Sequence, residues 1–358
     1  MTSLLLLIGL ILALMLVALW PQRGLWWQWQ RHRRFGERIR TEDALKHIHT
    51  GEMEGLRPTA ATLAEAINLS AEETARLLGR MEAAGLLTRH PDGLSLTPQG
   101  RTSALHIIRA HRLWERYLAD QTGYEANEWH RRADISEHQL GPEDTAALAA
   151  QLGNPTHDPH GDPIPDADGR FVGHGGRPLT ELAAGRTGRI VHIEDEPQVV
   201  YAQLLAEGIA PGQDVRVLEQ NPERVRFWAN GDEHVLAPAL AANIAAIPLA
   251  EPPSLAAMTL AALKPGQSGV VVRLSPQCRG PDRRRLLDLG ILPGTVITAE
   301  MVSPSGDPTA YRVRGALIAL RREQARLIYI RPSSAAGDGT STAAVDTTAS
   351  QTEWQETP

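Results

Sequence analysis

Two short stretches decide how this chain folds and what it binds: HRLWERYL at residues 111–118 and EWHRRADISEHQL at residues 128–140. Their metal-ligand residue types are His111 and Glu115 in the first stretch, and His130, Asp134, Glu137 and His138 in the second. If both stretches are helical, the offsets of 4 in the first and of 4, 7 and 8 in the second place each set on one helix face. Imidazole and carboxylate groups that converge in this way predict a divalent-metal site.

The ligand types narrow the choice of metal. No thiol takes part, so the site suits Fe(II), Mn(II), Co(II) or Zn(II) rather than Cu(I). Any one of these residues alone is better explained as part of a solvated helix surface. Six of them in two registers, beside the apolar pattern Leu113, Trp114, Tyr117 and Leu118, favour the metal site.

Length, charge and cysteine content limit the possible classes. At 358 residues the chain is long enough for two or three domains. Its net charge of -6 gives no global sign of nucleic-acid binding, so any basic surface must be local. The single Cys278 excludes a disulfide framework and fits a reducing cytosol.

The N-terminal residues predict a membrane anchor. Residues 3–20, SLLLLIGLILALMLVALW, are apolar over about the length that crosses a bilayer core. Trp20, Trp26, Trp27 and Trp29 follow as an interfacial belt, and six arginines lie between residues 23 and 40. No basic residue precedes the apolar run and no small-residue cleavage site follows it, which disfavours a signal peptide. We therefore expect an anchor at 1–22, a basic juxtamembrane segment at 23–40, and a single-pass protein of the bacterial inner membrane with its bulk in the cytoplasm.

Residues 41–100 predict a winged helix-turn-helix module. Helices are expected over 41–49, 59–67 and 70–84, the last opened by a capping box of Ser70 and Glu73. Two short apolar stretches then flank Pro91-Asp92-Gly93, a hairpin turn. Three helices followed by a hairpin are typical of a winged helix-turn-helix, although small helical domains without DNA affinity share this order.

The ligand-bearing helices follow, over 101–121 and 126–140, with another over 142–152. A passage rich in Pro and Gly, residues 154–178, indicates a domain boundary. We expect residues 101–168 to form a helical metal-binding domain.

The remainder contains an internal repeat. The pattern from Gly188 to Gly212 is echoed from Gly269 to Gly294, each with Val- and Ile-rich strands, a Leu-Leu pair and a Pro-Gly turn. The repeat predicts two small β-barrels, at 178–249 and 254–332, and the Ser-, Ala- and Thr-rich residues 333–358 predict a disordered tail. The expected fold class is α+β, with a transmembrane helix, a winged helix-turn-helix, a helical dimerisation domain and two SH3-like barrels.

The two ligand stretches, together with THDPHGDPIP at residues 156–165, resemble the metal-dependent repressors of the diphtheria toxin repressor family, which includes the manganese regulators. This resemblance runs from about residue 41 to residue 249. The second barrel, with GPDRRRLLDLGILPGT, looks like FeoA, a small SH3-like protein that works beside the ferrous-iron permease FeoB.

The resemblance implies two ligand sets. The ancillary site falls on His111, Glu115 and His130, and the primary site on Asp43, Asp134, Glu137 and His138. Carboxylates stand at residues 43 and 134, as in the manganese-responsive members. Lys46, however, stands where those members have a further carboxylate, so the resemblance does not decide between Fe(II) and Mn(II) as the metal. In the family, the first barrel can lend oxygen ligands to the ancillary site. Here Pro197 and Val200 stand at the positions expected to ligate, so any contribution would have to come from a neighbour such as Glu196 or Gln198.

The same resemblance implies homodimerisation through residues 101–152 and binding to double-stranded operator DNA. The residues expected to contact DNA are Ser70, Thr74, Arg76, Arg80 and Arg89. Glu72 near the start of the recognition helix would oppose the approach to phosphate.

Two functions agree with these features of the sequence, and a third has little support. The first is a membrane-anchored, Fe(II)- or Mn(II)-responsive transcriptional regulator that acts on DNA as a dimer. The alternative is a metal-sensing accessory of a ferrous-iron or manganese permease that does not bind DNA. A metallohydrolase is disfavoured, because no nucleophile motif or dedicated general base accompanies the ligands, so we expect no enzymatic activity.

Overall fold

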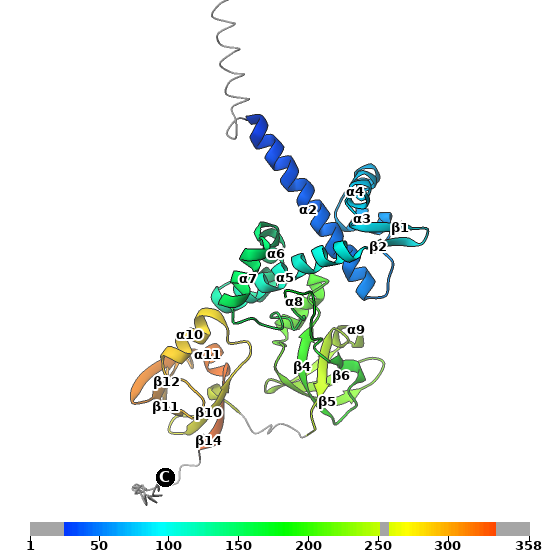
Figure 1. The fold of residues 1–358 in the computed structure, drawn as a ribbon. Coiled ribbons are helices and arrows are strands. Elements are labelled where there is room, and N and C mark those ends of the chain that lie inside the picture. The colour runs from blue at the N-terminus through cyan, green and yellow to red at the C-terminus, as the bar shows by residue number, and fades with distance from the viewer. Residues whose placement is uncertain (1–24, 251–257, 334–358) are drawn as a thin grey trace, which may run out of the picture. The chain divides into compact units, whose positions relative to one another are not determined.

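The computed structural model describes residues 25–250 and 258–333 (Figure 1). The chain begins with a winged helical module. Its elements are α2 (Leu25–Met53), α3 (Ala60–Ala66), α4 (Ala71–Ala83), β1 (Leu87–His90) and β2 (Gly93–Leu96). The two strands pair antiparallel with His90 opposite Gly93, as the hairpin turn predicts.

Local capping and a shared core define this module. Ser70 and Glu73 form the predicted capping box at the start of α4. Thr59 caps α3 in the same way, with Thr62 as its partner. Buried side chains from all three helices and both strands form one core, among them Ile48, Leu63, Leu77, Met81, Leu87 and Leu94.

Helix α2 is much longer than the sequence predicts, starting at Leu25 rather than at residue 41. Gly36 is the only glycine between these two residues, and no proline interrupts them. A single helical glycine costs only about 1 kcal/mol relative to Ala, so the helix continues through it. The predicted start at 41 was therefore wrong by sixteen residues.

The helical domain that follows has the elements α5 (Pro98–Gln121), α6 (Ala126–Ser136), η1 (Glu137–Gln139) and α7 (Pro142–Gln151). Thr97 caps α5, with Pro98 as its first residue. Gly100 lies against the hairpin side of the winged module, where an added Cβ would fall 1.9 Å from the carbonyl oxygen of Leu86. Only glycine permits this close approach, which fixes α5 to the winged module.

The predicted boundary at residues 154–178 is partly packed structure. Asp158, His160 and Ile164 are buried. One carboxylate oxygen of Asp158 accepts hydrogen bonds from the backbone N–H groups of His160, Gly161 and Asp162 at 2.8 to 2.9 Å. The Pro and Gly residues here therefore shape a tight, buried turn, and only part of the passage serves as a linker.

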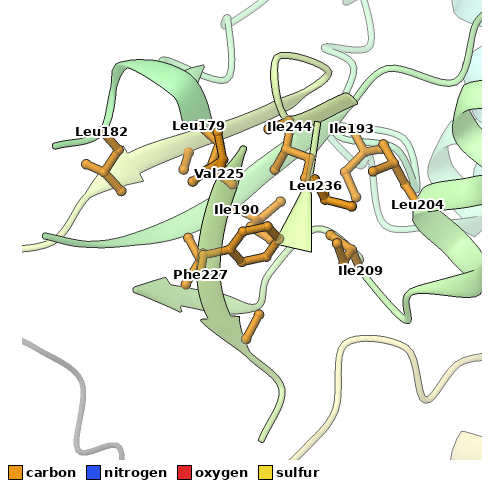
Figure 2. Packing of buried hydrophobic residues seen from close by; sticks show 14 of the residues in the cluster. Leu179, Leu182, Ile190, Ile193, Leu204, Ile209, Val225, Phe227, Leu236 and Ile244 are labelled. Atoms are coloured by element: carbon orange, nitrogen blue, oxygen red, sulfur yellow. The ribbon is translucent and has the colours of Figure 1, made fainter. Parts of the chain in front are cut away.

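The first small β domain contains one six-stranded sheet in the order β3-β8-β4-β5-β6-β7. Its elements are β3 (Arg177–Pro178), η2 (Leu179–Glu181), β4 (Thr187–Ile193), α8 (Gln198–Ala206), β5 (Asp214–Gln220), β6 (Val225–Ala229), β7 (Asp232–Leu236), α9 (Pro238–Ala241) and β8 (Ile244–Pro248). Phe227 lies in its core with Ile190, Leu236 and Ile244 around it (Figure 2). Alternating burial along β6 sends Val225, Phe227 and Ala229 inward, the period-2 pattern of a half-buried strand.

The second small β domain repeats this topology, with the sheet order β13-β12-β11-β10-β14-β9. Its elements are β9 (Met258–Thr259), η3 (Leu260–Ala262), β10 (Ser268–Leu274), α10 (Gly280–Asp288), β11 (Val296–Val302), β12 (Thr309–Val313), β13 (Ala316–Leu320), α11 (Arg322–Arg326) and β14 (Ile328–Ser333). Strand for strand, the pairing matches the first domain, as the sequence repeat predicts.

The chain divides into two compact units. The second unit holds the sheet of the second β domain, whereas the segment Ser275–Asp288 belongs to the first unit together with residues 25–250. Within the first unit, Gln277 Nε2 donates a hydrogen bond to the carbonyl oxygen of Gly208 at 2.7 Å.

The predicted membrane localisation needs correction. Across residues 25–250 and 258–333, no helix is long and apolar enough to cross a bilayer, and this finding contradicts a single-pass inner-membrane protein. The predicted span itself, residues 3–20, lies outside the described residues, as does nearly all of the predicted tail.

Candidate metal centre

The structure brings all seven predicted ligand residues together. They come from four elements: Asp43 from α2, His111 and Glu115 from α5, His130 and Asp134 from α6, and Glu137 and His138 from η1. They form three groups whose ligand atoms lie within 4.8 Å of one another: His111–Glu115–His130, Asp43–Glu137–His138 and His111–Asp134–Glu137. Because His111 and Glu137 each belong to two groups, the two predicted sites are one connected cluster.

His111 lies at the centre of this cluster. Its Nε2 is 3.1 Å from Glu115 Oε1, and its Nδ1 is 2.5 Å from Glu137 Oε2. Burial and the nearby Lys46 ammonium would both lower the pKa of His111, but Glu115 and Glu137 outweigh them and the pKa is raised. The pKa of Glu115 lies well below its usual range, because His111 and His160 outweigh the opposite effect of burial. One buried imidazole thus links both ligand sets.

The predicted single helix face is wrong for the second half of the motif. Helix α6 ends at Ser136, and Glu137 and His138 lie on a 3-10 turn. The tighter turn changes the direction of these two side chains. His130 and Asp134 stay together, with 3.5 Å between Nε2 and Oδ2, whereas His138 Nε2 lies 3.2 Å from Asp43 Oδ1 on α2.

His138 also contacts Glu42, a residue that the sequence did not single out. Its Nδ1 lies 2.7 Å from Glu42 Oε2. Burial would lower the pKa of His138, but hydrogen bonds with Asp43 and Glu42 outweigh it and raise the pKa to about 9. Arg38 forms an ion pair with Glu42 at 2.6 Å, so the carboxylate that touches His138 is itself held in place.

The loop before α8 contributes two carboxylates. Asp195 Oδ2 lies 2.8 Å from His130 Nδ1, and Glu196 Oε1 lies 3.2 Å from His130 Nε2. Burial opposes protonation of His130, but Asp195, Glu115 and Glu196 raise its pKa to about 12. The expectation for Glu196 agrees with this geometry. Gln198 borders the same cavity as His130 and Glu196 but begins α8, and Asp195, which was not singled out, makes the shorter contact.

His160 is a third residue that the sequence did not single out, after Glu42 and Asp195. Its side chain is 1% exposed, and neither ring nitrogen has a hydrogen-bond partner among the residues that the structure describes. Its Nδ1 lies 3.4 Å from Asp195 Oδ2 and 3.8 Å from Glu115 Oε2, and the three residues form a further buried group with ligand geometry. The sequence signal for His160 was the passage THDPHGDPIP, which contains it between two aspartates.

Lys46 is the one ammonium in this cluster of carboxylates. Its Nζ donates to Asp134 Oδ1 at 3.1 Å and to Glu137 Oε2 at 3.3 Å, and lies 3.1 Å from His111 Nδ1. Burial would lower the pKa of Lys46, but Glu137 and Asp134 outweigh it and the pKa is raised.

The residues predicted to contact DNA differ in availability. The prediction that Thr74 contacts DNA is wrong. This residue is 1% exposed and its hydroxyl donates to the carbonyl oxygen of Ser70, so it cannot reach a DNA groove. The Ser70 hydroxyl is used in the helix cap. Arg76 and Arg89 are paired with Glu72 and Glu82, at 3.0 and 3.1 Å, and Arg80 is exposed in the last turn of α4.

A winged helical module followed by a ligand-bearing helical domain and small β domains defines a class of metal-responsive DNA-binding regulators. Residues 97–166 match the family described as "Iron dependent repressor, metal binding and dimerisation domain", and residues 177–246 and 258–332 both match the FeoA domain. Residues 53–102, which span the winged hairpin, match the HemN C-terminal domain. Both β domains, at 178–249 and 254–332, were expected to be FeoA-like, and both match this one family.

Known relatives identify the family. The diphtheria toxin repressor of Corynebacterium diphtheriae is 34% identical over 192 residues, covering 51% of this chain and 85% of the relative. The iron-dependent repressor IdeR of Mycobacterium leprae is 32% identical over 220 residues, covering 55% and 92%. A solved manganese-dependent transcriptional repressor in complex with manganese superposes with a TM-score of 0.53 at 31% identity, covering 58% of this chain and 100% of that structure. The chain belongs to the diphtheria toxin repressor family. These relatives are transcriptional repressors, not enzymes.

Proposed function

We propose that this chain is an Fe(II)- or Mn(II)-dependent transcriptional repressor that acts as a homodimer on operator DNA. One observation carries the proposal: the ligand cluster joins α2 of the winged module, through Asp43, to α5, α6 and η1 of the helical domain. An ion held by this cluster would tie the DNA-reading module to the domain that the family uses for dimerisation.

The residues fit a hard divalent ion. We assign one position to His111, Glu115 and His130, with Asp195 and His160 beside them, and another to Asp43, Glu137 and His138, with Asp134 nearby. Imidazole nitrogen and carboxylate oxygen are ligands that suit Fe(II) and Mn(II). A buried imidazole with no hydrogen-bond partner costs free energy unless something satisfies it, and His160 is such a group. When bound, the ion would add positive charge beside these carboxylates.

The chain's own residues then explain how the signal would reach DNA. Asp43 and Ile48 lie on the same helix, and Ile48 belongs to the same buried core as Leu77 of α4. A fixed orientation of α2 therefore fixes α4, the expected recognition helix. In a two-fold dimer, this sets the separation of two recognition helices, which must be about 34 to 36 Å to enter successive major grooves.

Direct titration tests the metal part. We expect the purified protein to bind Mn(II), and His138→Ala and Glu137→Ala to weaken this binding strongly. Glu143→Ala, on the exposed face of α7, is the matched control. Unchanged affinity in both ligand variants would remove the assignment of these residues.

Oligomeric state and DNA binding test the regulatory part. We expect light scattering to give a dimer at micromolar concentration with metal present. Gel shifts with DNA from upstream of the protein's own gene should show Mn(II)-dependent binding. A monomer that does not bind this DNA under any metal condition would refute the proposed repressor function.

A second function keeps one specific observation in its favour. Arg76 and Arg89 are both occupied by carboxylates of the winged module, which reduces the basic surface available to phosphate. A metal-sensing accessory of a ferrous-iron or manganese permease would not need that surface. Metal binding without DNA binding in the same experiments would favour this accessory function.

A further inference from the structure

The group His111–Asp134–Glu137 has the geometry of a metal position, yet it already contains a cation. Lys46 Nζ lies within 3.3 Å of an atom of each of the three residues. The same three residues offer ligand atoms within 4.8 Å of one another. An ammonium and a divalent ion cannot share this space, because both need the same oxygen and nitrogen atoms.

The choice of lysine here is unusual for this chain. It contains 34 arginines and only two lysines, Lys46 and Lys264. Arginine presents a wide planar fork, whereas lysine ends in a compact ammonium with three donors. Two carboxylates and an imidazole that converge on one point leave room for a compact ammonium rather than a planar fork, so the local geometry explains why lysine stands here.

Burial makes the ammonium important. The Glu137 side chain is 1% exposed and that of His111 is 6% exposed, so water cannot compensate a lost partner at either residue. A buried carboxylate without a cation is strongly unfavourable. Lys46 supplies that cation from within the chain and needs no ion from solution.

We propose that Lys46 is a built-in cation that occupies the middle position of the cluster, between His111, Asp134 and Glu137, and excludes a metal ion from it. The inference rests on the proposed metal-binding function. It predicts that the chain binds ions only on either side of Lys46, at Asp43–Glu137–His138 and at the group around His130. Removal of the ammonium opens the middle position.

The test compares Mn(II) stoichiometry, by equilibrium dialysis with metal analysis, in the wild type, Lys46→Ala and the control Lys264→Ala, which removes the only other lysine. We expect Lys46→Ala to bind one more Mn(II) per chain than the wild type, and Lys264→Ala to match the wild type. Lys46→Leu, which keeps an apolar side chain in place of the stem, should give the same gain if Lys46→Ala does not fold.

Thermal unfolding provides an independent readout. Without metal, Lys46→Leu should unfold at a lower temperature than the wild type, because Asp134 and Glu137 have lost the ammonium, although Glu137 keeps His111 beside it. Saturating Mn(II) should raise its midpoint by more than it raises that of the wild type.

The outcomes separate the inference from the proposed function. If the wild type binds Mn(II) and both Lys46 variants bind the same number of ions, the inference is overturned and the proposed function stands. If neither the wild type nor the variants bind Mn(II), both are overturned.

Discussion

Glu42 offers a direct test of the metal centre, because it touches a proposed ligand without being one. Its Oε2 lies 2.7 Å from His138 Nδ1, while Nε2 of the same ring faces Asp43. A proton kept on Nδ1 by Glu42 leaves the lone pair of Nε2 free for a metal ion. We expect Glu42→Gln to weaken Mn(II) binding without abolishing it.

The magnitude follows from the contact that changes. A hydrogen bond to a charged acceptor contributes about 1.5 to 3 kcal/mol, and one to a neutral acceptor about 0.5 to 1.5 kcal/mol. Gln preserves the shape of Glu42 but offers only the neutral acceptor. The difference of about 1 to 1.5 kcal/mol corresponds to a loss of about 5- to 13-fold in affinity. Solvent screening should remove little of this, since the Glu42 and His138 side chains are only 12% and 7% exposed.

The measurement is isothermal titration of the purified protein with Mn(II). The matched control is Glu37→Gln, which removes the same charge from an exposed side chain of the same helix. Stoichiometry should not change in either variant. If Glu42→Gln binds Mn(II) as tightly as Glu37→Gln and the wild type, Glu42 does not orient a ligand and the reasoning fails.

Three further expectations concern DNA affinity, pH and packing. Glu72→Gln should strengthen Mn(II)-dependent DNA binding most at low salt, because it removes a carboxylate and frees Arg76 from a 3.0 Å ion pair. Arg76→Ala should weaken DNA binding by about 1 to 3 kcal/mol. Gel shifts at two salt concentrations that show no difference from the wild type would contradict both expectations. The pKa of His138 is raised to about 9, so its stabilising contribution is complete below about pH 6.5 and is lost as pH rises through about 9. Without metal, the midpoint temperature of unfolding should therefore fall as the pH rises across this window. In His138→Gln this dependence of the midpoint on pH should be flatter. Gly100→Ala should destabilise the protein by about 1 to 3 kcal/mol in denaturant unfolding, because its Cβ would lie 1.9 Å from a carbonyl oxygen. Its counterpart Gly79→Ala, with no atom closer than 3.7 Å in the middle of α4, should instead stabilise by about 0.5 to 1 kcal/mol.

Local signals in the sequence were sufficient for the winged module and for the repeat. The capping box of Ser70 and Glu73 and the turn at Pro91-Asp92-Gly93 depend only on residues within a few positions of each other, and the structure has both. The repeated pattern likewise predicted two similar small β domains, and their sheets have the same strand order. Such features persist in the fold because their hydrogen bonds and backbone angles are satisfied locally.

The ligand types were also readable from the sequence, but their arrangement was not. All seven predicted residues lie in one cluster, although α6 ends before Glu137 and the expected single helix face does not exist. A helical period assumes that the helix continues, but Glu137 and His138 lie on a 3-10 turn, from which they contact His111 and Asp43.

Tertiary structure alone decided which other residues enter the cluster. Asp195 and His160 reach His130 and Glu115 from segments far along the chain, and Lys46 reaches Glu137 across 91 positions. No periodicity connects such residues, because their approach depends on how the β domain, the buried turn at Asp158 and helix α2 pack on α5. The sequence therefore determined which chemical groups are available. Packing determined that an ammonium lies among the carboxylates and that the buried imidazole of His160 has no hydrogen-bond partner among the described residues.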